Sequence, residues 1–136
     1  DNLVLDPADT SRLRAVLDWE TATVGDAALD LGTTLAHWVD PDDPPAWRAM
    51  QARTGTVLPH GVTRAELVAM YEEATSAPVE DAAFAYVLGL FKVAVAAQQD
   101  HARFTTGRTN DQRFARLDEL VALPGTGAER AMHRAS

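Results

Sequence analysis

Cysteine is absent from this 136-residue sequence. Its absence excludes disulfide bonds, thiolate metal sites and a cysteine nucleophile, and it is compatible with the cytoplasmic location that we expect. Lys and Arg are also scarce: twelve scattered residues, nearly all Arg, stand against twenty Asp and Glu and leave a net charge of −8. Because a general nucleic-acid binder needs clustered Lys and Arg to contact phosphates, we expect no nucleic-acid partner.

Long uninterrupted apolar runs are also lacking. We expect no signal peptide and no segment long enough to cross a bilayer, and therefore no membrane partner. The nearest candidate, residues 82–97, is rich in Ala and is interrupted by Gly89 and Lys92, which favours a helix buried inside a helical domain. With 46% hydrophobic and 24% charged residues, the chain is typical of one soluble globular domain.

A short β-hairpin is predicted at the N-terminal end. Residues 3–5 and 15–17 are apolar and flank a cluster of turn-forming residues at 6–11. Antiparallel strands bring the residue before the first strand close to the residue after the second, so Asn2 and Asp18 should lie at the same end. Amide and carboxylate oxygens are ligands that Mg²⁺ accepts. On this geometry alone, a frayed terminal Asn and an Asp that caps a turn would explain the pair more simply.

Helical periodicity replaces the strand pattern after Gly25. Asp26 is expected to cap a helix that ends near Asp40, where prolines follow. Further helices are expected around 47–53, from a capping box at 63–66, over about 79–104, and from a second capping box at 109–112 as far as Pro124 and Gly125. The apolar stripe of the long helix, formed by Phe84, Val87, Leu88, Phe91 and Val95, is interpreted as core packing. The predicted fold class is therefore mainly α, with a short β-hairpin followed by helices.

The residues that follow the hairpin carry a more specific pattern. Asp18-Trp19-Glu20 precedes the element Gly25-Asp26-Ala27-Ala28-Leu29-Asp30-Leu31, and Asp1-Asn2-Leu3-Val4-Leu5 lies before the turn. This arrangement resembles the aminoglycoside phosphotransferase family, which shares the protein-kinase-like fold, and within it the branch associated with acyl-CoA dehydrogenases. The resemblance implies that residues 1–136 are a C-terminal lobe of an α+β parent, truncated within the catalytic loop. A catalytic and metal-binding hairpin would cover 1–18 and a helical subdomain 26–136.

The resemblance also implies roles for single residues. Asn2 and Asp18 would hold Mg²⁺ and, through it, the phosphates of ATP, while Trp19 would pack under the metal loop. Asp30 would be a structural pin that accepts hydrogen bonds from the backbone of the catalytic loop, and Asp26 would be a helix cap. The general-base Asp, the Gly-rich loop and the ATP-binding Lys of the family would precede this chain. The chain alone should therefore be inactive.

The implied reaction of the intact parent is transfer of the ATP γ-phosphoryl group to a small-molecule hydroxyl. The acceptor could be an aminoglycoside, a choline-like alcohol or a hydroxyacyl-CoA compound, and the sequence does not choose among them. One alternative is a catalytically silent helical module that binds a partner. Another is a pseudokinase, against which the two filled metal positions argue.

The expected loss of the N-terminal part has a structural consequence. Without it, the apolar side of the hairpin, at Leu3, Leu5 or Val16, should be partly uncovered. Exposed apolar strands pair readily with other chains. We therefore expect this surface to meet the missing N-terminal part of the same protein or a second copy of the chain.

Overall fold

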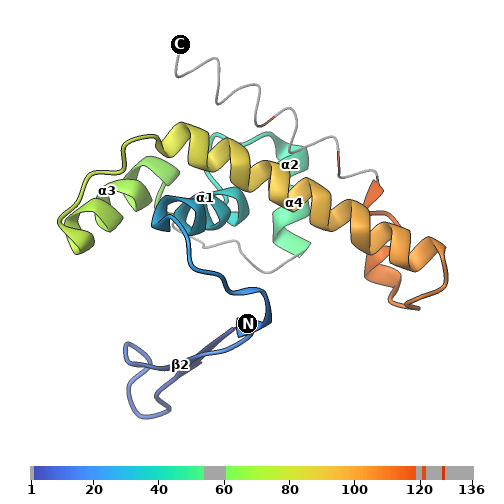
Figure 1. Cartoon of the computed structure of the whole chain (residues 1–136), viewed down its shortest axis with the longest axis horizontal. Helices are drawn as coiled ribbons and strands as arrows, with labels where there is room; N and C mark the ends of the chain where they lie inside the picture. Colours follow the sequence, from blue (N-terminus) through green and yellow to red (C-terminus); the bar gives the residue numbers. More distant parts are fainter. Residues whose placement is uncertain (1, 54–60, 119–120, 122–126, 128–136) are drawn as a thin grey trace.

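The structure is a computed structural model that describes residues 2–53, 61–118, 121 and 127. Its described part contains one two-stranded antiparallel sheet, four α-helices and two 3₁₀ helices. Figure 1 shows the hairpin projecting away from the layer that the helices form. The expectation of a mainly α chain with an N-terminal hairpin is confirmed for these residues.

The hairpin consists of β1 (Leu3–Leu5) and β2 (Leu13–Val16). The strands pair in the predicted antiparallel sense, in the register Leu3↔Val16, Val4↔Ala15 and Leu5↔Leu13, with an irregularity between the last two pairs. The second strand therefore begins earlier than residues 15–17 and ends one residue sooner. The connection between the strands therefore covers residues 6–12, whereas the predicted strands would leave residues 6–14 between them.

Asp6 organises that turn. Among the described residues, Asp6 is the only polar or charged one that is buried, with 5% of its surface exposed. Its carboxylate accepts from the backbone N–H of Ala8 at 2.9 Å and from Nε of Arg14 at 2.9 Å, and the Asp6 N–H donates to the Arg12 carbonyl at 2.9 Å. A buried carboxylate needs such donors to offset its lost hydration. The Asp6 side chain thus joins the start of the turn to β2.

The helical layer is built on the contact between α1 (Ala27–His37) and α4 (Ala82–Thr105), the longest helix in the described part of the chain. As predicted, Asp26 caps α1 by accepting from the Ala28 N–H at 2.9 Å. The helix ends at a cap on Trp38, slightly before the expected Asp40. The buried apolar residues of the core are Leu31, Leu35, Ala36, Trp47, Ala85 and Leu90.

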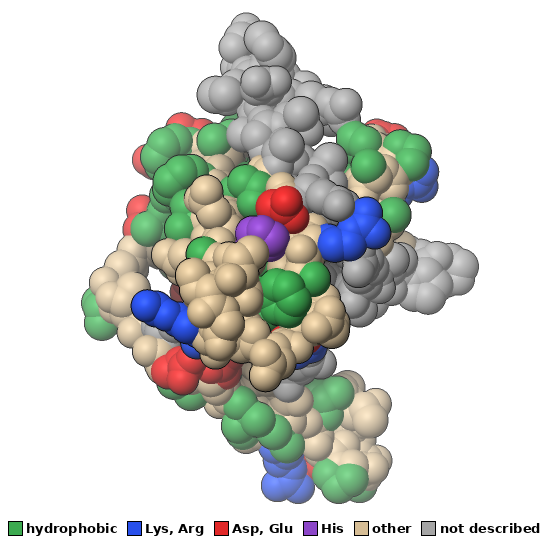
Figure 2. Space-filling view, turned by 90° about the vertical axis from the view of Figure 1, so that its right-hand side faces the viewer, with side chains coloured by type: hydrophobic (Ala, Val, Ile, Leu, Met, Phe, Trp, Pro, Cys, Tyr) green, Lys and Arg blue, Asp and Glu red, His purple; other side chains and the backbone are tan. Residues whose placement is uncertain are grey.

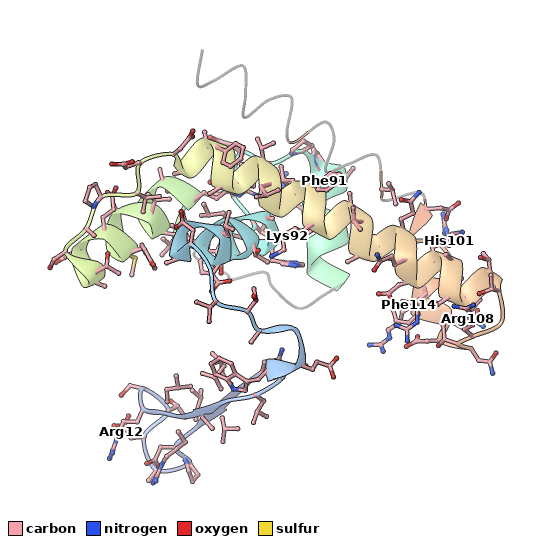
Figure 3. All side chains as sticks on the ribbon, viewed as in Figure 1. Arg12, Phe91, Lys92, His101, Arg108 and Phe114 are labelled. Atoms are coloured by element: carbon pink, nitrogen blue, oxygen red, sulfur yellow. The ribbon has the colours of Figure 1, made fainter. Side chains whose placement is uncertain are left out.

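Two glycines allow α1 and α4 to meet backbone to backbone. A Cβ atom added at Gly32 would overlap the carbonyl group of Ala85, and one added at Gly89 would overlap the carbonyl group of Gly32. Beside this crossing, Lys92 of α4 donates to the Thr33 hydroxyl of α1 at 3.1 Å (Figure 3). The glycine that interrupts the apolar run of α4 is therefore a contact residue of the core.

The interpretation of the large side chains of α4 as core is wrong for the two phenylalanines. Phe84 and Phe91 are 60% and 63% exposed, and the buried positions of the helix are Ala85, Gly89 and Leu90. The reason is steric, because only small residues permit the close approach to α1. The apolar stripe predicted from the sequence is therefore not the face of α4 that packs against α1.

By length and composition alone, α4 could cross a membrane, so the expectation that no segment is long enough is wrong on that criterion. One such helix is weak evidence, because core helices of soluble proteins pass the same test. In the described part of the chain, α4 packs against α1 and carries Lys92 near its centre.

The remaining helices are α2 (Pro45–Arg53) and α3 (Arg64–Thr75). The capping box that begins α3 is confirmed, with Thr63 accepting from the Glu66 N–H at 3.2 Å and Glu66 accepting from the Thr63 N–H at 2.8 Å. The second predicted capping box is wrong. The 3₁₀ helix η2 (Gln112–Phe114) is capped by Asp111, because that carboxylate lies two residues closer than Thr109 to the free N–H groups. The predicted helix end at Pro124 and Gly125 lies outside the described residues.

Arg64 joins α3 to the end of α1. Its guanidinium group donates to both carboxylate oxygens of Asp43, at 2.9 and 2.7 Å, and to the carbonyls of Leu35 and Trp38, at 2.9 and 2.6 Å. It also lies 4.8 Å from the ring centroid of Tyr86. A charged group with this number of acceptors and an aromatic face is a fixed part of the structure.

Candidate functional site

The hairpin brings Asn2 and Asp18 together, as its antiparallel pairing predicts. The side-chain amide of Asn2 donates from Nδ2 to Oδ2 of Asp18 at 3.1 Å. The backbone closes the same end, because the Leu17 N–H donates to the Asn2 carbonyl at 2.8 Å. Both side chains are exposed, so solvent and a ligand can reach them. Sixteen positions apart in sequence, the two residues form one polar site.

Asp18 has an unusual backbone conformation. Its φ and ψ angles are 64° and 52°, in the left-handed region that L-residues other than Asn and Asp rarely enter. It precedes the 3₁₀ helix η1 (Trp19–Thr21), yet its carboxylate makes no capping hydrogen bond to that helix. The simpler interpretation, in which Asp18 caps a turn, is therefore not what the geometry shows. Backbone strain at an exposed carboxylate is a common property of functional positions.

Trp19 follows Asp18 but is exposed. Its indole N–H donates to the Val16 carbonyl at 2.7 Å, which ties the residue after Asp18 back to β2. The expected packing of Trp19 under the metal loop is not present among the described residues. The indole instead fixes the direction in which the chain leaves the hairpin.

Asp30 lies apart from this pair. It belongs to the first turn of α1 and lines a cavity of about 420 Å³ with Ala27, Leu31, Thr34, Leu67, Met70 and Tyr71, between α1 and α3. Within the described residues, no hydrogen bond connects its carboxylate to the hairpin. Its expected role as a pin for the catalytic loop stays a prediction, since only the end of that loop would lie in this chain.

The apolar surface of the hairpin is uncovered, as expected. Leu3, Leu5 and Val16 are 58%, 45% and 42% exposed, and their strand partner Leu13 is exposed too. Figure 2 shows hydrophobic side chains on the surface of this part of the molecule. Since an isolated two-stranded hairpin is marginally stable in water, this surface is suited to contact with another polypeptide.

The donor set of the Asn2–Asp18 pair fits a hard divalent cation. One carboxylate and one amide oxygen are the ligand types that Mg²⁺ takes, with phosphate oxygens and water in the other positions. No group of three or more His, Cys, Asp or Glu that could hold a metal occurs in the part of the chain that the structure describes. A cation at this site would therefore depend on a ligand such as a nucleotide phosphate for most of its coordination.

Sequence reasoning missed three structural residues: Asp6, Arg64 and Gly32. Asp6 belongs to a run of turn formers, and this local pattern does not reveal its bond to Arg14, which lies eight positions further along the chain. Arg64 lies inside the capping box that was recognised, but its partners lie more than twenty positions earlier. Gly32 carries no local signal, because its helix would form as well with Ala.

A family model described as a phosphotransferase enzyme family matches residues 1–68, which is half of the chain. The matched segment contains the hairpin, the Asn2–Asp18 pair, Asp26 and Asp30. No curated protein and no solved structure shows a significant match to the chain. The match therefore covers the same residues as the candidate site.

Proposed function

This chain belongs to the phosphotransferase enzyme family, and we propose that it is the C-terminal lobe of an ATP-dependent kinase-like enzyme. The enzyme would transfer the γ-phosphoryl group of ATP to a small-molecule hydroxyl. The observation that carries the proposal is the contact between Asn2 and Asp18 at the base of the hairpin. The Asp18-Trp19-Glu20 motif supports the finer assignment to the branch associated with acyl-CoA dehydrogenases.

Asn2 and Asp18 would hold Mg²⁺ in this proposal. When bound, Mg²⁺ neutralises charge on the phosphates that it contacts. The contribution of the protein is positional: β1 and β2 fix the two residues at one end of the hairpin, and Trp19 fixes the chain direction after Asp18. Asp18 presents its carboxylate outward because it is not used as a helix cap.

The residues of this chain do not fit ATP on their own. The sequence has no Gly-rich phosphate-binding loop, and its single Lys, Lys92, donates to Thr33 on the helical layer. The proposal therefore assigns nucleotide binding, and the general base, to an N-terminal part of the same protein. Asp30 would then accept N–H groups of that part and pin it against α1. A cytoplasmic location accords with the absence of cysteine.

A second candidate is a helical module that binds a partner without catalysis. The observation that favours it is the uncovered apolar hairpin, with Leu3, Leu5, Leu13 and Val16 exposed. The two proposals give Asp18 different roles. An active phosphotransferase depends on Asp18 for turnover, whereas a binding module or a pseudokinase has no turnover that a change at Asp18 could lower. The same experiment separates them.

The test is a phosphotransfer assay on the intact parent with ATP, Mg²⁺ and a panel of small alcohols. The Asp18→Asn variant should lose at least about a hundredfold in kcat, since removing a group that stabilises developing charge typically costs ~10²–10³. Asp9→Asn is the matched control, because Asp9 lies in the turn of the same hairpin and the hydrogen bonds that its side chain makes to described residues all come from Ser11. Equal activity of Asp18→Asn, Asp9→Asn and wild type would refute the metal role, and a parent with no transfer activity would favour the binding module.

A further inference from the structure

The hydrogen bond between Asn2 and Asp18 uses only one atom of each side chain. Nδ2 of Asn2 donates to Oδ2 of Asp18, and among the described residues no hydrogen bond is made to Oδ1 of Asn2 or to Oδ1 of Asp18. A carboxylate only accepts hydrogen bonds, whereas a carboxamide has N–H donors and a separate oxygen. The pair is thus held together by a donor and still has one oxygen on each residue to offer a ligand.

The left-handed backbone conformation of Asp18 is one that Asp enters more readily than most L-residues, and a contact to its side chain stabilises it further. L-residues at positive φ are disfavoured, and persist where the surroundings hold them. The carboxylate is exposed and does not cap η1, so the described structure offers it the Asn2 amide as its hydrogen-bonding partner. The Leu17 N–H to Asn2 carbonyl bond, at 2.8 Å, in turn keeps Asn2 opposite Asp18.

We propose that Asn2 is a positioning residue for Asp18: its amide N–H bonds to Oδ2 of Asp18 and so helps to hold the left-handed backbone of that residue, while Oδ1 of Asn2 and Oδ1 of Asp18 stay free to ligate. This inference rests on the proposed function, and it adds a donor role to the ligand role of Asn2. It makes a specific distinction between Asn and Asp at position 2. An Asp there would keep the oxygen ligand and lose the donor, and would place two carboxylates in contact.

A swap of the two residues provides the sharpest test. Asn2→Asp alone sets like charges against each other, whereas Asn2→Asp combined with Asp18→Asn restores one donor and one carboxylate at unchanged net charge. Asn also tolerates the left-handed region well. Asn110 is the only other asparagine in the chain and is exposed, so Asn110→Asp is a control with the same chemical change.

The first measurement is NMR of the whole chain, uniformly labelled with ¹⁵N, in EDTA. The side-chain amide of Asn2 should exchange with solvent about fivefold more slowly than that of Asn110, the protection expected from one hydrogen bond of ordinary net strength. Asp18→Ala should abolish the difference. The backbone HN–Hα coupling of Asp18, which reports φ, should change in Asn2→Asp, return in the swap and stay unchanged in Asn110→Asp. Equal exchange of the two asparagines, or one coupling in all variants, would overturn the proposal.

The second measurement separates this inference from the proposed function. Substoichiometric Mn²⁺, used as a paramagnetic probe for the Mg²⁺ site, should broaden signals of residues 2 and 18 in the wild type and in the swap, and should not broaden them in Asp18→Ala. If Mn²⁺ broadens these signals but the exchange and coupling differences in EDTA are missing, a metal site remains and the positioning role of Asn2 is overturned. If the exchange and coupling differences in EDTA are present but Mn²⁺ broadens neither signal, the positioning role is supported and the proposed metal-binding role of Asn2 and Asp18 is refuted.

Discussion

Replacing Gly32 by Ala should destabilise the helical layer, although Ala is the better helix former. At this position α1 contacts α4 through backbone, and the added Cβ would overlap the carbonyl group of Ala85. A backbone carbonyl cannot rotate away as a flexible side chain would, so the two helices must move apart. That movement loosens the packing of Leu35 and Leu90, the largest fully buried side chains.

The expected magnitude follows from two opposing effects. Ala in place of Gly in a helix interior gains ~1 kcal/mol in helix propensity. Overpacking of a well-packed core costs ~1–3 kcal/mol, occasionally more, and the backbone obstacle places Gly32 at the upper end of this range. A net loss of about 2 kcal/mol should lower the melting temperature of a domain of this size by roughly 6–12 °C. Gly89→Ala should behave alike, and the double variant should lose less than the sum, because both changes open the same contact.

The assay is thermal and urea unfolding followed by far-ultraviolet circular dichroism. Gly25→Ala is the matched control, since an added Cβ at Gly25 meets nothing within 4 Å. It should be neutral or should stabilise by ~0.4–1 kcal/mol through the unfolded state. If Gly32→Ala and Gly89→Ala melt at or above the wild-type temperature, the helices do not meet backbone to backbone and the reasoning is refuted.

Three further predictions concern single side chains. Arg64→Lys should cost about 2 kcal/mol in urea unfolding, because an ammonium group cannot replace the paired bonds to Asp43 or the stacking on Tyr86; wild-type stability would contradict this. Partial desolvation lowers the pKa of His37 below its usual 6.5, although the residue is exposed at the surface, so protonation of His37 is somewhat less favourable in the native state than in the unfolded state. Stability present above pH 6.5 should therefore decline as the pH falls through the lowered pKa, and His37→Gln should flatten that decline; an equal slope in both proteins would count against it. Asp30→Ala should leave the melting of this chain within about 0.5 kcal/mol of wild type but lower that of the intact parent, where a parent variant that melts like wild type would exclude the pin.

Most of what could be predicted from the sequence depends on residues close together along the chain. The caps at Asp26 and Thr63 form because a side-chain oxygen lies two or three residues from the free N–H groups of its own helix. The Asn2–Asp18 pair could be predicted in the same way, since one turn connects the two strands that carry it. Even such a local prediction is wrong at η2, where the side chain of Asp111, and not that of Thr109, caps the helix.

The sequence by itself determined the hairpin, the caps at Asp26 and Thr63 and the meeting of Asn2 with Asp18, because turn and helix chemistry act over a few residues. Only the tertiary structure decided that Gly32 and Gly89 form the helix crossing, that Arg64 closes the end of α1, and that Asp30 faces a cavity and not the hairpin. These features join segments far apart in the chain, and the same local patterns are compatible with many packings. Which residues are buried, and where two backbones come close, depend on which helices pack together. The residues next to a position in sequence do not determine that packing.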